Sequence, residues 1–370
     1  MEIDVPAARR PRLTPAIADI RRAVREMLAP LVRSHDAVQN DGDSPRHAEG
    51  LGTPAGVAAE NSVVLVGLSG GADSLALAAA TAFEAPRAGI RAGAVIVDHG
   101  LQPGSADVAA RAAAHARALG LDPVLVRRVT IPAHTHADGP EGAARTARFG
   151  AFADAMVQAG ASHVLLGHTL DDQAETVLLG LTRGSGATSL HGMAPQTGPY
   201  LRPLLRIRRE TTRQFCVDAG LEPWQDPQNL DPRFARVRVR STVLPMLETE
   251  LGPGIAEALA RTAAQLREDS NALDAMILEA IEDICEPAEA GIAVSVGALE
   301  ANPAALRNRI IRHVVVSEFG VGLERVHVEA VVRLITHWHG QRPLDLPGVR
   351  VARRAGMLLF QSNSNSNTSA

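Results

Sequence analysis

The segment whose residue types most clearly suggest chemistry is a glycine-rich turn that follows the apolar, β-branched run Val63–Gly67. Such a run is typical of a buried strand. The turn consists of Ser69, Gly70, Gly71, Ala72, Asp73 and Ser74. Glycines bring bare backbone amides close to a ligand, and the start of a following helix favours an anion. The turn therefore predicts a phosphate site, where Mg²⁺ would separate Asp73 from the phosphates. The alternative is a plain turn in which Asp73 or Ser74 caps the helix.

A second group of side chains is acidic. Asp171 and Asp172 are adjacent, and Glu175 lies four residues after Asp171, on the same face of a helix. Adjacent carboxylates suit Mg²⁺ or a substrate ammonium group. If Thr169 caps this helix, Asp172 falls at the capping-box position, which is a structural alternative for that carboxylate alone.

Two arginines and two histidines complete the set. Arg145 and Arg148 share a helix face, although Arg145 has an alternative partner in Glu141, four residues earlier. His99 and His168 each follow an expected strand, and His99 is equally compatible with an ordinary loop histidine.

These side chains require a framework of alternating strands and helices. Apolar runs predict strands over residues 63–67, 92–97, 123–128 and 163–167, and Ala-rich segments predict helices over 74–83, 107–119, 141–159 and 169–181. Repeated βα units indicate an α/β fold with a doubly wound parallel sheet, which binds ligands at the carboxyl ends of its strands.

The remaining segments flank this framework. A helix is expected over residues 14–29 and is predicted to end at Pro30. Polar, Gly-rich composition predicts a mobile linker over 34–60. Beyond this framework, the pattern predicts one long helix or two over residues 254–285, followed by a small α/β or helical unit. A hairpin is predicted over 349–360 and a disordered tail over 361–370.

Composition excludes several classes of protein. All 37 basic residues are arginine, so a Walker A loop, which needs lysine, is excluded. Two distant cysteines exclude a disulfide scaffold, a four-cysteine zinc site and a cysteine-ligated iron–sulfur cluster, and they fit a reducing cytoplasm. No apolar run reaches the ~18–20 residues of a membrane span. The net charge of −4 does not itself suggest nucleic acid, but arginines cluster at residues 202–213, 233–240 and 307–312.

The turn after the first strand resembles the pyrophosphate loop of the N-type ATP pyrophosphatases, which transfer AMP to a carbonyl or carboxyl oxygen. Three further segments resemble motifs of one family in that group, the tRNA(Ile)-lysidine synthetases. The segment at Asp98-His99-Gly100-Leu101 is similar to "HHGL", and Glu141 to Phe149 is similar to "E-x-x-x-R-x-x-R-Y". The segment from His168 to Thr176, with Arg183-Gly184-Ser185-Gly186, is similar to "H-H-x-D-D-Q-A-E-T … R-G-x-G".

This resemblance implies an ATP-dependent ligation of free lysine to C2 of the wobble cytidine in the CAU anticodon of tRNA(Ile), through an adenylated cytidine. It implies a catalytic domain over residues 61–250 and a smaller, mainly helical tRNA-binding domain over 251–360. The helix and linker expected within residues 1–60 lie outside the resemblance. A homodimer is compatible with the resemblance.

The resemblance also assigns roles to residues. Asp73, Arg148, Asp171 and Asp172 are implied to be catalytic, with Arg145 and Arg148 at the ATP and Asp73 and Asp172 at Mg²⁺. His99, His168 and Glu175 are implied at the substrate. The implied tRNA contacts are Arg206, Arg208, Arg236, Arg238, Arg240 and Arg309.

Three other functions remain open at this point. A sulfur transferase acting on tRNA would need Cys-x-x-Cys pairs, which this chain lacks. A nucleotide sensor without catalysis would not need Asp73, Arg148 and the Asp171–Asp172 pair together. An amide-forming synthetase for a small acid would not need the arginine clusters.

Overall fold

The computed structural model describes residues 13–40, 62–100, 104–130, 139–184, 187–289 and 291–363. The chain divides into two compact units, Met1–Gln265 and Leu266–Ala370, and the division falls inside the long helix α10 (Ile255–Ile284). The functional domain limits expected from the sequence stay a prediction.

The first unit is built on a six-stranded sheet with the order β3-β2-β1-β4-β6-β5. Neighbouring strands from β3 to β6 run parallel, and only the short edge strand β5 is antiparallel to β6. This arrangement confirms the predicted doubly wound α/β fold. The strands are β1 (Val63–Gly67), β2 (Arg91–Asp98), β3 (Val124–Arg128), β4 (Ala161–Leu165), β5 (Gln196–Thr197) and β6 (Tyr200–Leu201).

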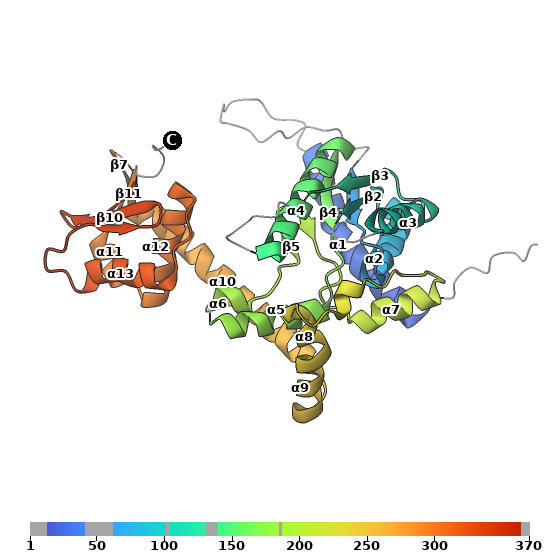
Figure 1. Cartoon of the computed structure of the whole chain (residues 1–370). Coiled ribbons are helices and arrows are strands. Elements are labelled where there is room, and N and C mark those ends of the chain that lie inside the picture. Colours follow the sequence, from blue (N-terminus) through green and yellow to red (C-terminus); the bar gives the residue numbers. More distant parts are fainter. Residues whose placement is uncertain are drawn as a thin grey trace, which may run out of the picture. The chain divides into compact units, whose positions relative to one another are not determined.

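Helices cover both faces of the sheet. Alternate residues of β1 point to opposite sides, and since the residues on both sides are apolar, each side packs against helices. Val64 and Val66 belong to the core shared with α1, α2, α3 and α7, whereas Val63 and Leu65 pack with Phe152 of α4 (Figure 1). The helices of this unit are α1 (Pro15–Asn40), α2 (Ala72–Glu84), η2 (Pro86–Ala88), α3 (Ser105–Ala118), α4 (Gly139–Ala159), α5 (Leu170–Arg183), α6 (Ala187–Leu190), α7 (Arg209–Asp218), η3 (Pro227–Leu230), α8 (Ala235–Arg238), η4 (Val239–Val243) and α9 (Leu244–Leu251).

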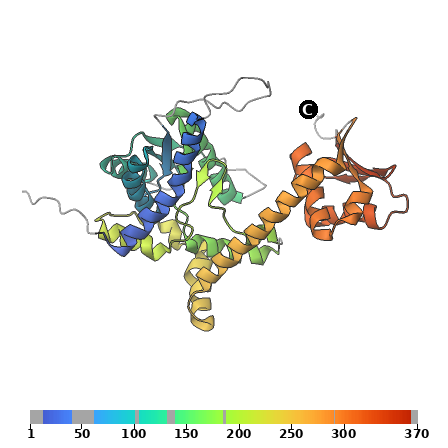
Figure 2. The same ribbon diagram turned by 180° about the vertical axis from the view of Figure 1, so that it is seen from behind.

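Helix α1 differs from its prediction, because it continues through Pro30 to Asn40. Proline removes one helical hydrogen bond and costs about 3 kcal/mol inside a helix. Apolar residues on both sides of Pro30 nevertheless pack on the core, with Leu28 fully buried before it and Leu31 partly buried after it. Figure 2 shows α1 in dark blue, lying against the other elements of the first unit. The linker predicted over 34–60 is wrong for residues 34–40, which continue α1, and residues 41–60 lie outside the described residues.

The second unit combines helices with a five-stranded antiparallel sheet of order β7-β8-β11-β10-β9. The predicted hairpin at 349–360 is confirmed by β10 and β11, and α10 confirms the long helix. Gln361 and Ser362, expected in the tail, extend β11, and residues 364–370 lie outside the described part. The elements are β7 (Cys285–Ala288), β8 (Gly291–Ser295), α11 (Val296–Ala301), α12 (Ala304–Phe319), α13 (Arg325–Thr336), β9 (Leu344–Leu346), β10 (Val349–Arg354) and β11 (Met357–Ser362).

Candidate active site

The glycine-rich turn lies at the carboxyl end of β1 and leads into α2. Gly70 has φ of +86°, a left-handed conformation that favours glycine. Gly71 precedes the first turn of α2, where no side chain caps the amides, so these donors remain available to a ligand. The hydroxyl of Ser74 lies 3.1 Å from that of Ser69 and donates to the carbonyl of Gly71. The turn therefore offers backbone N–H groups and the exposed Ser69 hydroxyl as donors, while the Ser74 hydroxyl donates within the turn.

Gly167, just after β4, packs directly against this turn. A Cβ at Gly167 would lie 3.1 Å from the carbonyl carbon of Asp73 and 3.1 Å from the amide nitrogen of Ser74. Both are backbone atoms, so Gly167→Ala must shift the start of α2. We expect this substitution to weaken ATP binding about 10-fold, as measured by titration calorimetry. Gly150→Ala on α4 is the matched control, because a Cβ there has no neighbour within 4 Å. Equal ATP affinity in both variants would contradict the role of Gly167.

The acidic residues lie on the first two turns of α5. Thr169 and Asp172 form a reciprocal capping box: the Asp172 carboxylate accepts from the Thr169 amide at 2.8 Å, and the Thr169 hydroxyl accepts from the Asp172 amide. The helix cap that the sequence allowed as an alternative role for Asp172 is therefore formed. It uses only Oδ2 of Asp172, however, and Oδ1 is bound by Arg209 at 2.7 Å. Asp172 thus both caps the helix and faces the site.

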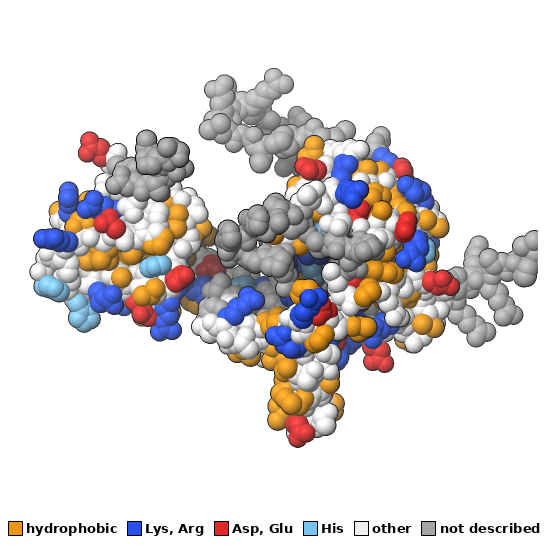
Figure 3. Space-filling model, in the orientation of Figure 1, with side chains coloured by type: hydrophobic (Ala, Val, Ile, Leu, Met, Phe, Trp, Pro, Cys, Tyr) orange, Lys and Arg blue, Asp and Glu red, His pale blue; other side chains and the backbone are white. Residues whose placement is uncertain are grey.

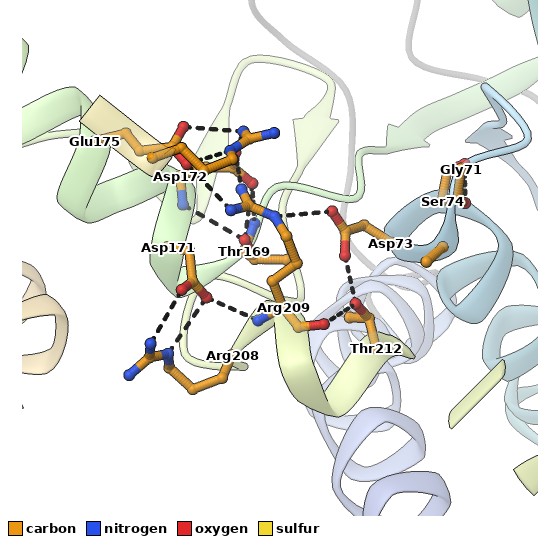
Figure 4. A network of polar contacts seen from close by, with 12 residues as sticks. Gly71, Asp73, Ser74, Thr169, Asp171, Asp172, Glu175, Arg208, Arg209 and Thr212 are labelled. Atoms are coloured by element: carbon orange, nitrogen blue, oxygen red, sulfur yellow. Dashed lines mark hydrogen bonds and ion pairs between the residues drawn. The ribbon is translucent and has the colours of Figure 1, made fainter. Parts of the chain in front are cut away.

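Arg209, the first residue of α7, lies at the centre of the cluster (Figure 4). Its guanidinium pairs with Asp172 at 2.7 Å, with Glu175 at 3.1 Å and with Asp73 at 3.5 Å. It therefore links the first turn of α2, beside the phosphate loop, to the acidic face of α5. Asp73 also accepts a hydrogen bond from the hydroxyl of Thr212, one turn further along α7.

Glu175 is completely buried and is enclosed by arginines. Besides Arg209, it pairs with Arg240 at 2.7 Å and with Arg236 at 3.7 Å. Arg236 and Arg240 are four residues apart and so reach the same side of the helix, whereas Arg238 bonds to the carbonyl groups of Pro232 and Arg233. Arg240 lies in the π-helical turn η4, a feature frequently found at functional sites.

Asp171 faces a different side of the cluster from Asp172. It pairs with Arg208 at 3.1 Å and accepts the backbone N–H of Arg209 at 2.7 Å. Arg208 also pairs with Glu257 of α10 at 2.5 Å. A cleft of about 250 Å³ adjoins these groups, and its lining includes Asp171, Glu175, Arg208, Arg209, Arg240 and Glu248.

Burial and charge shift the pKa values of the two carboxylates in opposite directions. Burial raises the pKa of Asp73, and the opposing effects of Thr212 and Arg209 are smaller. Burial would also raise the pKa of Asp172, but Arg209 and the Thr169 hydrogen bonds outweigh it and lower the value. Burial would lower the pKa of Arg209, yet its carboxylate neighbours, Asp172 first, raise it. The Arg209–Asp172 pair is therefore ionised at neutral pH.

The two histidines lie near Arg148. Burial lowers the pKa of His99, and the positive charge of Arg148 lowers it further. Burial lowers the pKa of His168 to about 4, with further lowering by Arg202, Arg148 and Arg145, against the effect of Asp172. In both rings Nδ1 is buried without a hydrogen-bond partner. Both rings are therefore uncharged at neutral pH. The guanidinium carbon of Arg145 lies 5.0 Å from the centre of the Phe149 ring, on the same helix.

The acid stability of the first unit is expected to depend on His168. An unfolded histidine gains its proton near pH 6.5, whereas the folded ring does so near pH 4, so stability is lost as the pH falls between these values. This shift corresponds to about 3 kcal/mol. His168→Asn should therefore lose about 3 kcal/mol less than the native chain between pH 7.5 and 4. Urea unfolding followed by Trp224 fluorescence in a Trp338→Phe background measures this, and parallel pH profiles would contradict it.

The structure brings together most residues that the sequence assigned to the site. Asp73, Asp172 and Glu175 meet at Arg209, and His99 and His168 lie near Arg148. The side chain of Glu141 and residues 101–103 and 185–186 lie outside the described part of the chain.

The six arginines expected at tRNA have varied surroundings, and their role stays a prediction. Arg206 is exposed. Arg208, Arg236 and Arg240 pair with the acidic cluster instead of facing only solvent. Arg309 pairs with Asp274 at 2.6 Å within the second unit.

Two residues at the centre of the cluster, Arg209 and Thr212, were missed by sequence reasoning. Arg209 lay within a recognised arginine cluster, but that cluster was interpreted only as a surface for RNA. One signal for Arg209 was available in the sequence. Asp172 and Glu175 lie on a helix expected to pack against the sheet, and buried carboxylates require cationic partners elsewhere in the chain.

Asp73 and Asp172 are suitable ligands for Mg²⁺. Carboxylate oxygens are the donors that Mg²⁺ prefers, and both side chains already contact one common cationic group, the Arg209 guanidinium. Among the described residues, no group of three or more His, Cys, Asp or Glu side chains has metal-binding geometry. The two carboxylates would therefore need oxygen atoms from the nucleotide or water to complete a Mg²⁺ shell.

The parallel sheet, the uncapped turn after β1 and the carboxylates facing it define an ATP-binding domain of the PP-loop class. Comparison of sequences agrees, since residues 46–247 match the family described as "PP-loop domain" and residues 295–359 match the "TilS substrate binding domain". The described helices include none with the length and apolar character to cross a membrane.

Curated relatives narrow the class to one family. The tRNA(Ile)-lysidine synthase of Leifsonia xyli subsp. xyli is 64% identical over 83% of this chain and 92% of its own. The tRNA(Ile)-lysidine synthase of Thermobifida fusca is 52% identical over 79% of this chain and 89% of its own. That of Streptomyces coelicolor is 47% identical over 92% of this chain and 97% of its own. The chain belongs to the tRNA(Ile)-lysidine synthase family.

Proposed function

We propose that this chain is the enzyme that joins free lysine to C2 of the wobble cytidine in the CAU anticodon of tRNA(Ile), using ATP. The observation that carries the proposal is the contact between the phosphate loop and the acidic cluster. One guanidinium, that of Arg209, touches Asp73 beside the loop and both Asp172 and Glu175 on α5. A nucleotide and an amine can therefore be held next to each other.

In the first step, the cytosine O2 attacks the α-phosphorus of ATP. A phosphorus–oxygen bond forms, the bond to the β-phosphate oxygen breaks, and pyrophosphate leaves. The amides at Gly71–Asp73 and the hydroxyl group of Ser69 bind the phosphates. Arg148, near His99 and His168, would stabilise the charge that develops on the transferred group.

In the second step, the ε-amine of lysine attacks the adenylated C2. The bound ammonium group first releases one proton to solvent. A carbon–nitrogen bond then forms, AMP leaves with the oxygen, and the nitrogen gives up a second proton. The cleft of about 250 Å³ beside Asp171 and Glu175 offers space for the lysine chain, and the carboxylates Asp172 and Glu175 would bind its ammonium group before attack.

Mg²⁺, when bound, would neutralise phosphate charge, and Asp73 and Asp172 are the residues proposed to hold it. Without Mg²⁺, the guanidinium group of Arg209 contacts both Asp73 and Asp172 and so holds the two carboxylates toward one common position. Thr212 further fixes Asp73 through its hydroxyl group.

Sulfur transfer is disfavoured by the environment of the one cysteine near the phosphate loop. Cys216 lies behind the loop, with its sulfur 3.5 Å from the carbonyl of Ala72. Burial, followed by the charge of Asp73, raises its pKa to about 12, so it stays a thiol at neutral pH. The other cysteine, Cys285, lies on β7 in the second unit.

RNA recognition would use arginines distributed over both units. Figure 3 shows Arg side chains on the drawn face of each unit, interspersed with acidic groups. The arginine side chains among them are the groups that would contact the phosphates of a folded RNA, which is recognised mostly by its shape. We propose Arg206 and Arg238, which are not ion-paired to the acidic cluster, as the first tRNA contacts to test. The cytoplasm, which holds both tRNA and ATP, remains the proposed location.

A reconstituted reaction tests the function. The purified chain should release AMP only when tRNA(Ile) with a CAU anticodon and lysine are both present, whereas the first release of pyrophosphate should require the tRNA but not lysine. Mass spectrometry of that tRNA after incubation with isotope-labelled lysine should show one added lysine at the wobble cytidine. Formation of ADP, or an unmodified tRNA after complete ATP consumption, would contradict the proposal. A tRNA with a GAU anticodon, which offers no wobble cytidine, is the control.

A further inference from the structure

The carboxylates proposed to bind the lysine ammonium group are already occupied by cations of the chain itself. Oε1 of Glu175 accepts from Arg209 at 3.1 Å and from Arg240 at 2.7 Å, and Oε2 accepts from Arg240 at 3.0 Å. Oδ1 of Asp172 accepts from Arg209 at 2.7 Å and from Arg240 at 3.4 Å. An incoming ammonium group therefore has to replace a guanidinium.

Arg209 is better placed to leave than Arg240. Its Nε lies 3.5 Å from Asp73 in the first turn of α2, the longest of its three ion pairs. A triphosphate bound at the adjacent turn would bring several negative charges to that side of the guanidinium. Arg240, by contrast, makes its short contacts on the far side, with both oxygens of Glu175.

The charge balance of the cluster supports this direction of movement. Five carboxylates, those of Asp73, Asp171, Asp172, Glu175 and Glu257, pair with four guanidinium groups, those of Arg208, Arg209, Arg236 and Arg240. The cluster therefore has no excess of positive charge while no substrate is bound. A bound nucleotide brings negative charge to the loop, whereas the lysine ammonium group brings positive charge to Glu175. If Arg209 moves from the carboxylates toward the phosphates, it neutralises charge at the loop, and the ammonium group replaces it at Glu175.

We propose that Arg209 is a positioning residue that closes the lysine site until ATP binds. Its guanidinium occupies the ammonium position between Asp172 and Glu175 in the free enzyme, and the phosphates draw it away. This inference rests on the proposed function, because it takes lysine as the amine. Lysine then binds after ATP, and the two affinities are coupled through one side chain.

Calorimetry with the full chain tests the coupling. L-lysine is titrated in the presence of Mg²⁺, first alone and then with α,β-methylene ATP, which is not cleaved between its α- and β-phosphates. The native chain should bind lysine at least about 10-fold more tightly with the nucleotide, within the range usual for coupled sites. In Arg209→Gln, lysine should bind equally well with and without the nucleotide, because the position between Asp172 and Glu175 is already open.

Two further variants separate this role from a general loss of structure. Arg209→Lys keeps a cation at the position and should retain part of the coupling. Gln214→Ala changes an exposed residue of the same helix that does not line the cleft, and it should retain all of the coupling. Weaker lysine binding by Arg209→Gln with an unchanged ratio, or equal lysine affinity of the native chain in both titrations, would overturn the inference and leave the proposed function intact. Absence of lysine binding under every condition, tRNA included, would overturn both.

Discussion

Replacing Glu175 with glutamine is expected to reduce lysidine formation by about 10³-fold and to lower the free energy of unfolding by about 3–5 kcal/mol. The Glu175 side chain is 0% exposed and pairs with Arg209, Arg236 and Arg240. Glutamine fills nearly the same volume but removes the negative charge, so the guanidinium groups that meet there lose a buried partner. The lysine ammonium group loses one of its proposed partners for the same reason.

Activity and stability can be separated for this position. Glu175→Asp keeps the charge and should recover most of the stability, while the shorter side chain still lowers the rate of lysine transfer. Glu257→Gln is the matched control, since this residue pairs with Arg208 at the edge of the same cluster and its side chain is 35% exposed. Mass spectrometry of the tRNA and urea unfolding measure the two effects. A Glu175→Gln chain that makes lysidine at the native rate would refute the assignment.

The framework of the first unit was predictable because it depends on local patterns. The run Val63–Gly67 is apolar on both faces, which indicates a strand covered by helices on each side, and Gly70 marks the turn. Thr169 and Asp172 have the spacing of a capping box, which is formed. The end of α1 was not predictable, because the packing of Leu31 after Pro30 depends on residues far along the chain.

The centre of the site could not be predicted from the sequence in the same way. Asp73 and Arg209 are distant in the chain, and only the fold of α7 against α2 brings Thr212 and Arg209 to the phosphate loop. The arginine cluster at residues 233–240 was expected to contact tRNA, yet the helical turns direct Arg236 and Arg240 to Glu175. Partners of this kind are tertiary information.

Asp73→Asn is expected to lower the rate of tRNA- and lysine-dependent AMP formation by about 10³-fold while leaving the fold intact. Asparagine has the shape of a protonated aspartic acid, can still accept the hydrogen bond of Thr212, and loses only the charge that faces Arg209 and the proposed Mg²⁺. Burial already raises the pKa of Asp73, so the neutral side chain is tolerated and stability should change little.

The measurement is the release of radioactive AMP and pyrophosphate from labelled ATP at saturating tRNA and lysine. Asp122→Asn is the matched control, because this carboxylate lies in the same unit, 83% exposed and paired only loosely with Arg91 at 3.4 Å. The control should keep the native rate. Since the charge of Asp73 acts on the nucleotide and that of Glu175 on the amine, Asp73→Asn should lose pyrophosphate release, whereas Glu175→Gln should still release pyrophosphate and accumulate the adenylated tRNA. The same defect in both variants would mean that the two carboxylates do not serve separate steps.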